Sequence, residues 1–240
     1  MTRIDVALVE RGLFASRAKA REAIEAGLVA IDGRKVAKPS EPVTADARIE
    51  ASAPYEWVSR GGVKLEAALD VFAIDPAELS CLDIGASTGG FTHVLLSRGA
   101  RNVTCVDVGT GQLHPDIERD ARVKNLEQTD ARKLAASDLP APPDLIVIDV
   151  SFISLDRILP HVLALAAPGA RLVALVKPQF EAGPEHVRKG VVRDEKIHAS
   201  VCAKIEKLVD DLGWRRIGLI ASPIAGGDGN REFLIGAQRL

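Results

Sequence analysis

The segment Cys81–Phe91 combines a short apolar run, an acid and a glycine-containing turn. Glycines in such a turn let a ligand approach the backbone closely. The spacing Gly85-x-x-x-Gly89-Gly90 differs from the dinucleotide fingerprint, and no Gly-Lys-Ser/Thr follows, which argues against a phosphate-binding loop. A second apolar run ends in Asp107, where an acid can bind both ribose hydroxyls of a nucleoside. The pattern predicts a nucleoside cofactor such as S-adenosylmethionine, although the same turn could serve a protein that binds another ligand.

Four charged residues occupy positions from which they could act together: Lys64, Asp149, Lys177 and Glu232. Asp149 and Lys177 each follow a strongly apolar run, and such strand ends are where open α/β sheets keep their active residues. Methyl transfer from a sulfonium to an alcohol needs a base, and a lysine can serve only in its neutral form. Nearby cations favour that form, whereas carboxylates orient the ammonium and oppose it. Charged residues also end apolar strands for ordinary reasons, so spacing alone leaves a joint role open.

The elements that must position these residues follow an α/β pattern from residue 61 onward. Strands are predicted at 81–84, 102–106, 123–127, 144–150, 171–176, 217–220 and 232–235. The run 144–150 is nearly continuously apolar, as expected of a parallel strand buried on both faces. Helices are predicted from Gly61 and over 198–212, and the polar stretch 183–195 is a candidate lid. By its local pattern alone, Lys64 is a surface residue.

Composition limits the class of protein. An apolar content of 47% and a mean hydropathy of +0.08 are typical of a globular protein with a substantial core. No run approaches the roughly 18 uncharged apolar residues of a membrane helix, and the charged start of the chain lacks an apolar signal region. The three cysteines and five histidines have no metal-ligand spacing, so we expect no metal, inert buried thiols and a cytoplasmic location. With a net charge of −2, any attraction to nucleic acid must be local.

Basic residues concentrate near the N-terminus, where seven lie between Arg11 and Lys38 against three acids. The pattern predicts a helix over 3–12, a second helix over 17–26 capped by Ser16, and a hairpin around Asp32-Gly33. Arg17 and Arg21 are one helical turn apart and share a face. Such a face can neutralise RNA phosphates, but it can also be an ordinary solvated helix surface.

This region resembles the S4 RNA-binding domain. The resemblance rests on Arg3-Ile4-Asp5, Leu8–Leu13, Ser16-Arg17, Ala20, Ile24, Gly27–Val29 and Asp32–Val36. Residues 53–60 break the helical pattern and are a predicted linker, which Trp57 is expected to anchor because an aromatic side chain in a linker usually packs on a neighbouring domain. The S4 resemblance implies a small α+β domain over residues 1–52. It also implies that structured RNA is bound by Arg3, Arg11, Arg17, Lys19, Arg21, Arg34 and Lys35.

Almost the whole chain resembles the TlyA (haemolysin A-like) family, with residues 61–240 as the expected methyltransferase domain. The matching motifs are Ser59–Leu65, Asp83–Phe91, Val147–Ser154 and Val176–Glu181. The family has an S4 domain followed by an FtsJ-like, Rossmann-like class I methyltransferase sheet. The resemblance implies that Lys177 is the general base of a tetrad completed by Lys64, Asp149 and Glu232. It implies a cofactor site lined by Gly85, Ser87, Gly89, Gly90, Phe91, Asp107 and Asp130.

The resemblance also implies a substrate. Family members use S-adenosylmethionine to methylate the ribose 2′-hydroxyl of cytidine in ribosomal RNA, so ribosomal subunits are the expected partner. The large-subunit 23S rRNA is the first candidate, and the small-subunit 16S rRNA is the second. Three other classes compete with this hypothesis. They are a non-catalytic ribosome-binding or assembly factor, a haemolysin-type membrane-active protein, and a small-molecule methyltransferase.

Overall fold

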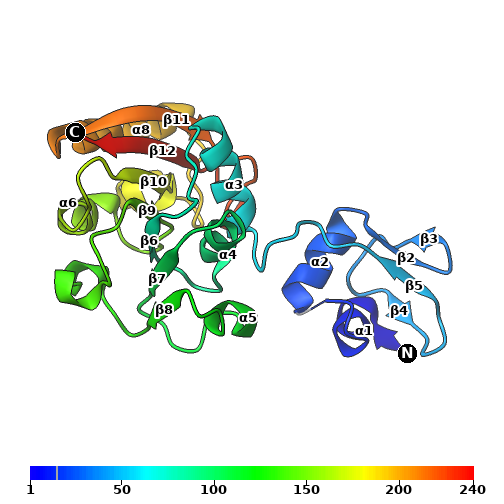
Figure 1. Ribbon diagram of the computed structural model, residues 1–240. Helices are drawn as coiled ribbons and strands as arrows, with labels where there is room; N and C mark the ends of the chain where they lie inside the picture. The colour runs from blue at the N-terminus through cyan, green and yellow to red at the C-terminus, as the bar shows by residue number, and fades with distance from the viewer. Residues whose placement is uncertain (15) are drawn as a thin grey trace. The chain divides into compact units, whose positions relative to one another are not determined.

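The computed structural model describes residues 1–14 and 16–240, and it divides the chain into two compact units (Figure 1). The smaller unit is Met1–Glu56 and the larger is Trp57–Leu240. The boundary falls inside the segment 53–60, for which the sequence predicts a linker. Each unit has its own cluster of buried hydrophobic side chains.

The smaller unit packs two helices against short strands. Its elements are β1 (Thr2–Arg3), α1 (Ile4–Glu10), α2 (Arg17–Glu25), β2 (Val29–Ile31), β3 (Arg34–Lys35), β4 (Pro42–Val43) and β5 (Ile49–Ala51). Strand β2 lies between β3 and β5 in an antiparallel sheet, while β1 pairs with β4. The core joins Leu8 of α1, Ile24 of α2 and Val29 of β2, which are almost fully buried.

Local signals in the smaller unit are largely confirmed. The Ser16 hydroxyl accepts a hydrogen bond from the Lys19 amide at 3.3 Å and caps α2. Asp32 and Gly33 both have positive φ, at 50° and 79°, as a two-residue type I′ hairpin turn requires. The helix predicted over 3–12 is shorter, because extended Arg3 pairs with Pro42 as part of β1 and the helix begins only at Ile4.

The larger unit is built on a seven-stranded sheet in the order β11-β12-β10-β9-β6-β7-β8. Its strands are β6 (Ser80–Ile84), β7 (Asn102–Val106), β8 (Val123–Leu126), β9 (Leu145–Ile148), β10 (Arg171–Val176), β11 (Trp214–Ala221) and β12 (Phe233–Arg239). Strands β6 to β10 are mutually parallel, and β12 inserts antiparallel between β10 and β11. The strand order reverses between β6 and β9. Open α/β sheets bind ligands outside the carboxyl ends of strands at such a switch point.

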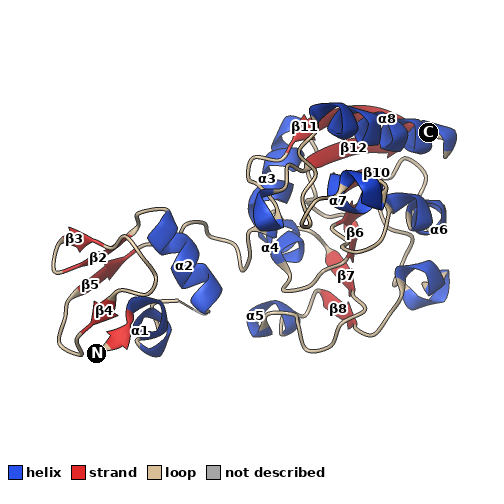
Figure 2. Cartoon of the chain, turned by 180° about the vertical axis from the view of Figure 1, so that it is seen from behind, coloured by secondary structure: helices blue, strands red, loops and turns tan. Residues whose placement is uncertain are grey.

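Helices cover both faces of this sheet. They are α3 (Gly61–Val71), α4 (Gly90–Ser97), α5 (Pro115–Glu118), α6 (Leu159–Ala164), α7 (Pro178–Glu181) and α8 (Glu195–Asp211), with 3₁₀ turns η1 (Ala131–Lys133), η2 (Ala136–Asp138), η3 (Leu155–Arg157), η4 (Pro184–His186) and η5 (Gly227–Gly229). Helix α8 packs on β11 and β12, and the single turn of α7 directly follows β10 (Figure 2).

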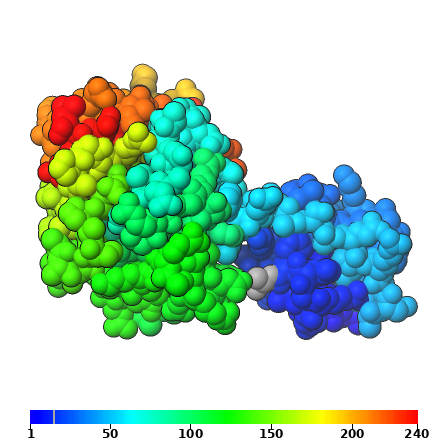
Figure 3. All heavy atoms as spheres, viewed as in Figure 1, coloured from blue at the N-terminus to red at the C-terminus, as the bar shows by residue number. Residues whose placement is uncertain are grey.

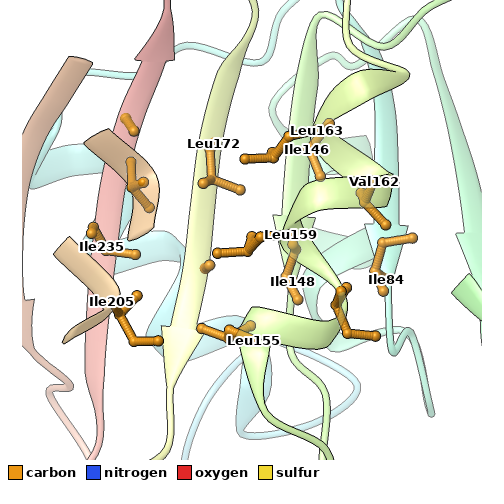
Figure 4. Packing of buried hydrophobic residues seen from close by; sticks show 14 of the residues in the cluster. Ile84, Ile146, Ile148, Leu155, Leu159, Val162, Leu163, Leu172, Ile205 and Ile235 are labelled. Carbon is orange, nitrogen blue, oxygen red and sulfur yellow. The ribbon is translucent and has the colours of Figure 1, made fainter. Parts of the chain in front are cut away.

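Alternate residues of the central strands face α6 and α8. Ile146 and Ile148 of β9 and Leu172 of β10 pack in one cluster with Leu159 of α6 and Ile205 of α8 (Figure 4). Because successive residues of a strand point to opposite faces, the intervening residues face the other layer. Burial on both faces explains why β9 and β10 are almost purely apolar.

On the opposite face, the end of α3 covers strands β11 and β12. A Cβ atom on Gly236 of β12 would lie 2.6 Å from the Phe72 ring, and one on Gly218 of β11 would lie 3.2 Å from it. Glycine at 236 therefore lets the Phe72 ring rest directly on the strand backbone. This close packing places the end of α3 beside β12, the strand that follows Glu232.

The predicted fold class is confirmed as a mixed α/β sheet domain preceded by a small α+β unit. Element ends differ by a few residues. The strand predicted over 144–150 is the shorter β9, so Asp149 stands just beyond its last residue. The closing strands are longer than predicted and form one edge of the sheet, seen as the orange and red region of Figure 3.

Candidate active site

The turn after β6 is held in an unusual backbone conformation. Gly85, Ser87 and Gly89 all have positive φ, at 81°, 48° and 87°. A Cβ atom on Gly85 would collide with the backbone carbonyl of Asp149, so only glycine lets the ends of β6 and β9 approach this closely. The turn consequently lies directly beside the residue that follows β9.

Asp107, which follows β7, ties this turn in place. Its Oδ2 accepts a hydrogen bond from the Ser87 amide and its Oδ1 accepts one from the Gly109 amide, both at 2.8 Å. Each carboxylate oxygen has a second lone pair. The side chain can therefore hold the turn and still accept hydrogen bonds from two ligand hydroxyls.

A cavity of about 530 Å³ opens at this switch point, within the range of small-molecule sites. Five predicted site residues line it: Gly85, Ser87, Asp107, Asp130 and Asp149. Other lining residues, which the sequence did not single out, include Val108, Gln112, Thr129, Arg132, Phe152 and Ile153. The cavity thus has acids on the β7 and β9 sides and apolar side chains between them.

Three predicted cofactor residues lie outside this lining. Gly89 begins α4 in the left-handed conformation, and a Cβ on Gly90 would collide with Ser59 Oγ and approach the Gly62 amide. Phe91 is buried, with 3% of its surface exposed. The geometry gives Gly90 and Phe91 a packing role between the first turns of α3 and α4, whereas Gly89 lies against Leu113 and Ile117. Their place in a cofactor site remains a prediction from the resemblance.

Asp130 lines the cavity but already has a strong partner. Its carboxylate accepts hydrogen bonds from Arg132, with Oδ2 2.6 Å from Nη2, and this guanidinium lowers the pKa of Asp130 to about 2. It also caps the turn η1 through the Arg132 amide. Asp130 is therefore a permanent anion that positions Arg132 at the rim of the cavity.

Asp83, the acid inside β6, is a further residue of this region that the sequence pattern does not assign to the site. Its side chain is fully buried and its Oδ2 accepts a hydrogen bond of 2.6 Å from the Thr92 hydroxyl. Oδ1 has no hydrogen-bond partner among the described residues. Burial raises the pKa of Asp83 to about 7, and the charges of Asp149 and Asp107 contribute to the increase. The sequence signal for this residue is an acid in the middle of an apolar strand, because a buried carboxyl in such a position is unusual.

The four predicted catalytic residues form two ion pairs. Lys64 Nζ lies 2.5 Å from Glu232 Oε2, with both side chains buried, and Lys177 Nζ lies 2.6 Å from Asp149 Oδ1. Lys177 also donates a hydrogen bond to the Ser151 hydroxyl at 2.9 Å. The local pattern of Lys64 predicts an exposed side chain, and this prediction is wrong. It pairs with Glu232, immediately before β12, and only 7% of the residue is accessible.

The single turn α7 connects these pairs to one another. Lys177 ends β10 in an extended conformation, and Pro178 starts the turn at the next residue. Two residues beyond Lys177, Gln179 donates a hydrogen bond to Glu232 Oε1 at 3.2 Å. The base candidate and the partner of Lys64 are thus linked through one short helical segment.

A second cavity of about 620 Å³ adjoins the first and shares Arg132, Phe152 and Ile153 with it. The other lining residues are Ser154, Arg157 and Phe180. Phe152 and Phe180 have ring centroids 5.0 Å apart, and Lys177 Nζ lies 6.0 Å from the Phe180 centroid. Phe152 is 91% exposed and has a φ of 64°, which is a strained conformation for a bulky residue. Such strain often accompanies a functional position.

Glu181 holds the loop that carries Phe152. Its Oε1 accepts a hydrogen bond of 2.7 Å from the Leu155 amide, and its Oε2 accepts one from the Ser154 hydroxyl. Its side chain is 2% exposed and lies 3.6 Å from Lys204 Nζ. The last residue of α7 therefore fixes the loop on the far side of the aromatic pair.

Three of the predicted RNA-binding residues gather around one acid in the smaller unit. Arg3, Arg17 and Arg21 each place a guanidinium nitrogen 3.0 Å from the carboxylate of Asp5. Their own side chains are about half exposed. These arginines lower the pKa of Asp5 well below its usual range.

The other four predicted RNA-binding residues are arranged differently. Arg11 donates hydrogen bonds to the carbonyls of Thr44, Ala45 and Ala47, and so stabilises the loop between β4 and β5. Arg34 pairs with Glu41 at 2.8 Å, and Lys19 lies over the Tyr55 ring, 5.0 Å from its centroid. Lys35 is exposed on β3. The structure thus separates the predicted set into one cluster and several individual positions.

Several expectations concern metals, thiols and membranes. Within residues 1–14 and 16–240, no group of three or more His, Cys, Asp and Glu side chains is arranged to hold a metal ion. The same residues include no helix that is long and apolar enough to cross a membrane. Cys81 and Cys105 are buried, and burial raises the pKa of each thiol to about 12.

Trp57, the predicted anchor, is confirmed as a packing residue of the larger unit. It is 8% exposed, its ring makes an edge contact with His93 of α4, and its indole donates a hydrogen bond to Glu66 of α3 at 3.1 Å. A Cβ on Gly62 would collide with the indole ring, so glycine in the first turn of α3 makes room for it.

Comparison with known proteins agrees with this architecture. Residues 57–239 match the FtsJ-like methyltransferase family, and residues 2–49 match the S4 domain. The chain is 45% identical over 236 residues to the 16S/23S rRNA (cytidine-2′-O)-methyltransferase TlyA of Mycobacterium tuberculosis, covering 97% of this chain and 88% of that protein. It is 37% identical over 179 residues to the 23S rRNA (cytidine-2′-O)-methyltransferase TlyA of Campylobacter jejuni, covering 74% and 69% of the two chains.

A solved structure shows the same arrangement of elements. A hemolysin-named protein from Streptococcus thermophilus superposes with a TM-score of 0.80 at 42% identity, covering 99% of this chain and 88% of that one. The name hemolysin is therefore attached to members of a group whose fold is that of a methyltransferase. With its switch-point cavity, its paired lysines and carboxylates and its N-terminal S4 unit, the chain belongs to the FtsJ-like methyltransferase family, among the S4-containing TlyA proteins.

Proposed function

We propose that this protein transfers a methyl group from S-adenosylmethionine to the ribose 2′-hydroxyl of a cytidine in ribosomal RNA. The observation that carries the proposal is the Lys177–Asp149 ion pair, because Asp149 lines the switch-point cavity and Lys177 Nζ lies 6.0 Å from the ring centroid of Phe180, which lines the second cavity. A base at this position can reach a hydroxyl that enters from one side while a methyl donor occupies the other. The names of the M. tuberculosis and C. jejuni relatives support ribosomal RNA and cytidine as the substrate.

The residues of the first cavity fit an adenosine cofactor. Asp107 has free lone pairs for the two ribose hydroxyls, and the positive-φ turn exposes backbone rather than side chains to the ligand. Val108 and Ile153 supply apolar surface for the adenine. When bound, S-adenosylmethionine supplies an electrophilic methyl group and a positive charge.

In the proposed mechanism, Lys177 would first release a proton to solvent, and its neutral Nζ would then accept the proton of the ribose 2′-hydroxyl. Transfer of the methyl group to the ribose oxygen would leave S-adenosylhomocysteine. Asp149 and Ser151 direct the nitrogen, since both contact it in the structure. Lys64 adds positive charge but is kept away from base chemistry by its buried pair with Glu232. The proton then passes from Lys177 to solvent, to which its side chain is 11% exposed.

The second cavity fits the target nucleotide. Single-stranded bases are commonly recognised by stacking on aromatic side chains, and modified bases or riboses are often turned out of a helix into a pocket. Phe152 and Phe180 offer such a surface, while Arg132 and Arg157 on the same cavity can contact phosphates. In this arrangement Phe180 positions the nucleotide next to the residue that removes its proton.

The N-terminal unit supplies RNA affinity through Arg3, Arg17 and Arg21, with Lys35 as an additional exposed cation. Arginines bind phosphates through their forked N–H donors. We propose that the protein acts in the cytoplasm, where ribosomal subunits are available. The 23S rRNA is the first candidate substrate, and the 16S rRNA is the second because the M. tuberculosis relative is named for both.

Mapping of ribose methylation tests this function directly. Ribosomal RNA from cells with and without the gene is compared position by position, and the gene is then restored with either lysine or alanine at position 177. We expect one or more cytidine 2′-O-methyl marks that disappear without the gene and return only with Lys177. Identical maps in all strains would refute the function and leave a non-catalytic ribosome-binding factor as the better explanation.

A further inference from the structure

Asp5 is the most completely enclosed acid of the N-terminal unit. Its side chain has no exposed surface, although the residues that surround it are cations at the surface. Its Oδ1 accepts a hydrogen bond from Arg3 Nε at 3.0 Å. Its Oδ2 accepts three, from Arg3 Nη2 at 3.2 Å and from Arg17 Nη2 and Arg21 Nε at 3.0 Å.

The three arginines come from different parts of the unit. Arg3 is in β1, whereas Arg17 and Arg21 are one turn apart on α2, and Asp5 lies on α1. A single carboxylate on α1 therefore gathers guanidinium groups from two other elements, β1 and α2. Long arginine side chains lose considerable rotamer freedom when they are fixed, and a partner that fixes them beforehand removes this cost from a later binding step.

The cluster keeps most of its capacity to bind anions. One carboxylate against three guanidinium groups leaves a net charge of +2. Each guanidinium has five N–H donors. Asp5 uses two of those on Arg3 and one each on Arg17 and Arg21. The acid is inside while the arginine side chains are 47%, 51% and 48% exposed, so each arginine remains accessible to a ligand from solvent.

We propose that Asp5 is a positioning residue for RNA recognition, which orders Arg3, Arg17 and Arg21 into one rigid site for neighbouring phosphates. This inference rests on the proposed function, because it assumes that the N-terminal unit binds RNA. It makes an unusual prediction about charge. An acid on an RNA-binding surface normally repels phosphates, so its removal normally strengthens RNA binding. Removal of the Asp5 charge should instead weaken RNA binding, because the three arginines lose their common partner.

The first test is the full-length variant Asp5→Asn, which has one more positive charge than the wild type. Affinity for purified ribosomal subunits is measured across a salt series, together with thermal unfolding and S-adenosylmethionine binding. We expect about tenfold weaker binding, because one or two arginine side chains must then be ordered when RNA binds. The slope of log affinity against log salt concentration should be shallower by about 1 to 2. Cofactor affinity should not change. Tighter binding with an unchanged salt slope would overturn the proposal.

Glu10→Gln is the matched control, because Glu10 is also on α1, is exposed, and gives the same change in charge. It should bind subunits as well as the wild type or better. If Asp5→Asn prevents the N-terminal unit from folding, the double variant Arg17→Lys with Arg21→Lys decides. It keeps the charge and loses the guanidinium forks, so wild-type binding would overturn the proposal and weaker binding would support it.

A third variant separates this inference from the proposed function. With Arg3, Arg17 and Arg21 all changed to alanine, subunit binding should fall further than in Asp5→Asn. If the triple variant binds normally, the arginines do not contact RNA, and the RNA-binding role proposed for this surface is wrong. If the triple variant binds weakly but Asp5→Asn binds tightly, the arginines act only through their charge and the inference about Asp5 alone is wrong.

Discussion

Gln179 donates a hydrogen bond from Nε2 to Oε1 of Glu232 at 3.2 Å, and through it α7 contacts both ion pairs of the site. Lys177, two residues earlier, holds Asp149, while Glu232 holds Lys64. Phe180 and Glu181, the next residues, contact Phe152 and the loop beyond it. One helical turn therefore sets the position of the base candidate, the buried pair and the aromatic surface together, and these parts should respond jointly to changes in α7.

Replacement of Lys177 tests the base assignment. Lys177→Ala should reduce single-turnover methyl transfer by about 10²- to 10⁴-fold, as for loss of a general base. Lys177→Arg should be equally inactive, because a guanidinium keeps its proton and cannot accept another. Both should bind S-adenosylmethionine nearly as the wild type does, measured by calorimetry. Near-wild-type rates for the arginine variant with saturating RNA would mean that only a positive charge is needed at this position.

The buried pair of Lys64 and Glu232 makes a prediction about stability. Lys64→Met leaves a carboxylate buried without its cation and should lower the free energy of unfolding by roughly 3–5 kcal/mol. The double variant Lys64→Met with Glu232→Met should recover most of this loss and still be inactive. Urea unfolding provides the measurement. The exposed pair Lys207–Asp211 is the control, and Lys207→Met should stay within about 0.5 kcal/mol. Equal losses at both pairs would contradict the assignment.

Asp107 should dominate recognition of the cofactor ribose. Asp107→Ala should weaken S-adenosylmethionine binding by roughly 1–3 kcal/mol, the range for lost charge-assisted hydrogen bonds. The amides of Ser87 and Gly109 also lose their acceptor, so the turn itself should loosen. Asp107→Asn, which keeps one oxygen, should lose less. Calorimetry that gave the folded alanine variant wild-type affinity would remove Asp107 from the cofactor site.

Asp83 should make stability depend on pH. Burial raises the pKa of Asp83 to about 7, whereas a free aspartate has a pKa of about 3.9. Between about pH 4 and pH 7, the folded protein therefore keeps a proton on Asp83 that the unfolded chain has released. The contribution of Asp83 to the free energy of unfolding therefore falls as pH rises from about 4 to 7 and stays low above that range.

Asp83→Asn should remove this dependence and be relatively more stable at pH 8 than at pH 5. Urea titrations at the two pH values measure it, with the exposed Asp211→Asn as the control. If the difference in stability between wild type and Asp83→Asn were the same at both pH values, the carboxyl would not titrate in this window.

Phe152 should contribute to RNA but not to cofactor binding. Base stacking on an aromatic side chain is worth roughly 1–3 kcal/mol, so Phe152→Ala should reduce kcat/KM for RNA by about 10- to 100-fold, and Phe152→Tyr should retain most activity. Cofactor affinity should stay constant. Val71→Ala, at another exposed apolar residue, is the control. Unchanged RNA kinetics in Phe152→Ala would exclude the aromatic surface as a nucleotide site.

Local sequence was sufficient to predict the positions of residues that stand where a strand ends. Asp107, Asp149 and Lys177 directly follow β7, β9 and β10, so the alternation of apolar runs and acids locates them within a residue or two. The turn at Gly85 was predictable for the same reason. These predictions succeeded because the carboxyl edge of a parallel sheet is determined by its order along the chain.

Partners that are distant in sequence could not be predicted in this way. Lys64 and Glu232 are 168 residues apart, and no periodicity near Lys64 indicates that β12 will cover it. The pairing of Asp5 with Arg21 and the positive φ of Phe152 likewise depend on packing between elements. The resemblance to a known family suggested the tetrad, whereas its division into two ion pairs required the structure.

The separation of Lys64 and Glu232 along the chain also determines when their ion pair can form during synthesis of the protein. Lys64 lies before the first strand of the sheet, and Glu232 comes immediately before the last strand, which inserts between two earlier ones. A nascent chain that has not yet added Glu232 and β12 has Lys64 without its counterion and β10 without its neighbour. Formation of this buried ion pair thus awaits release of the segment from Glu232 onward from the translating ribosome, and chains that terminate before Glu232 lack the pair.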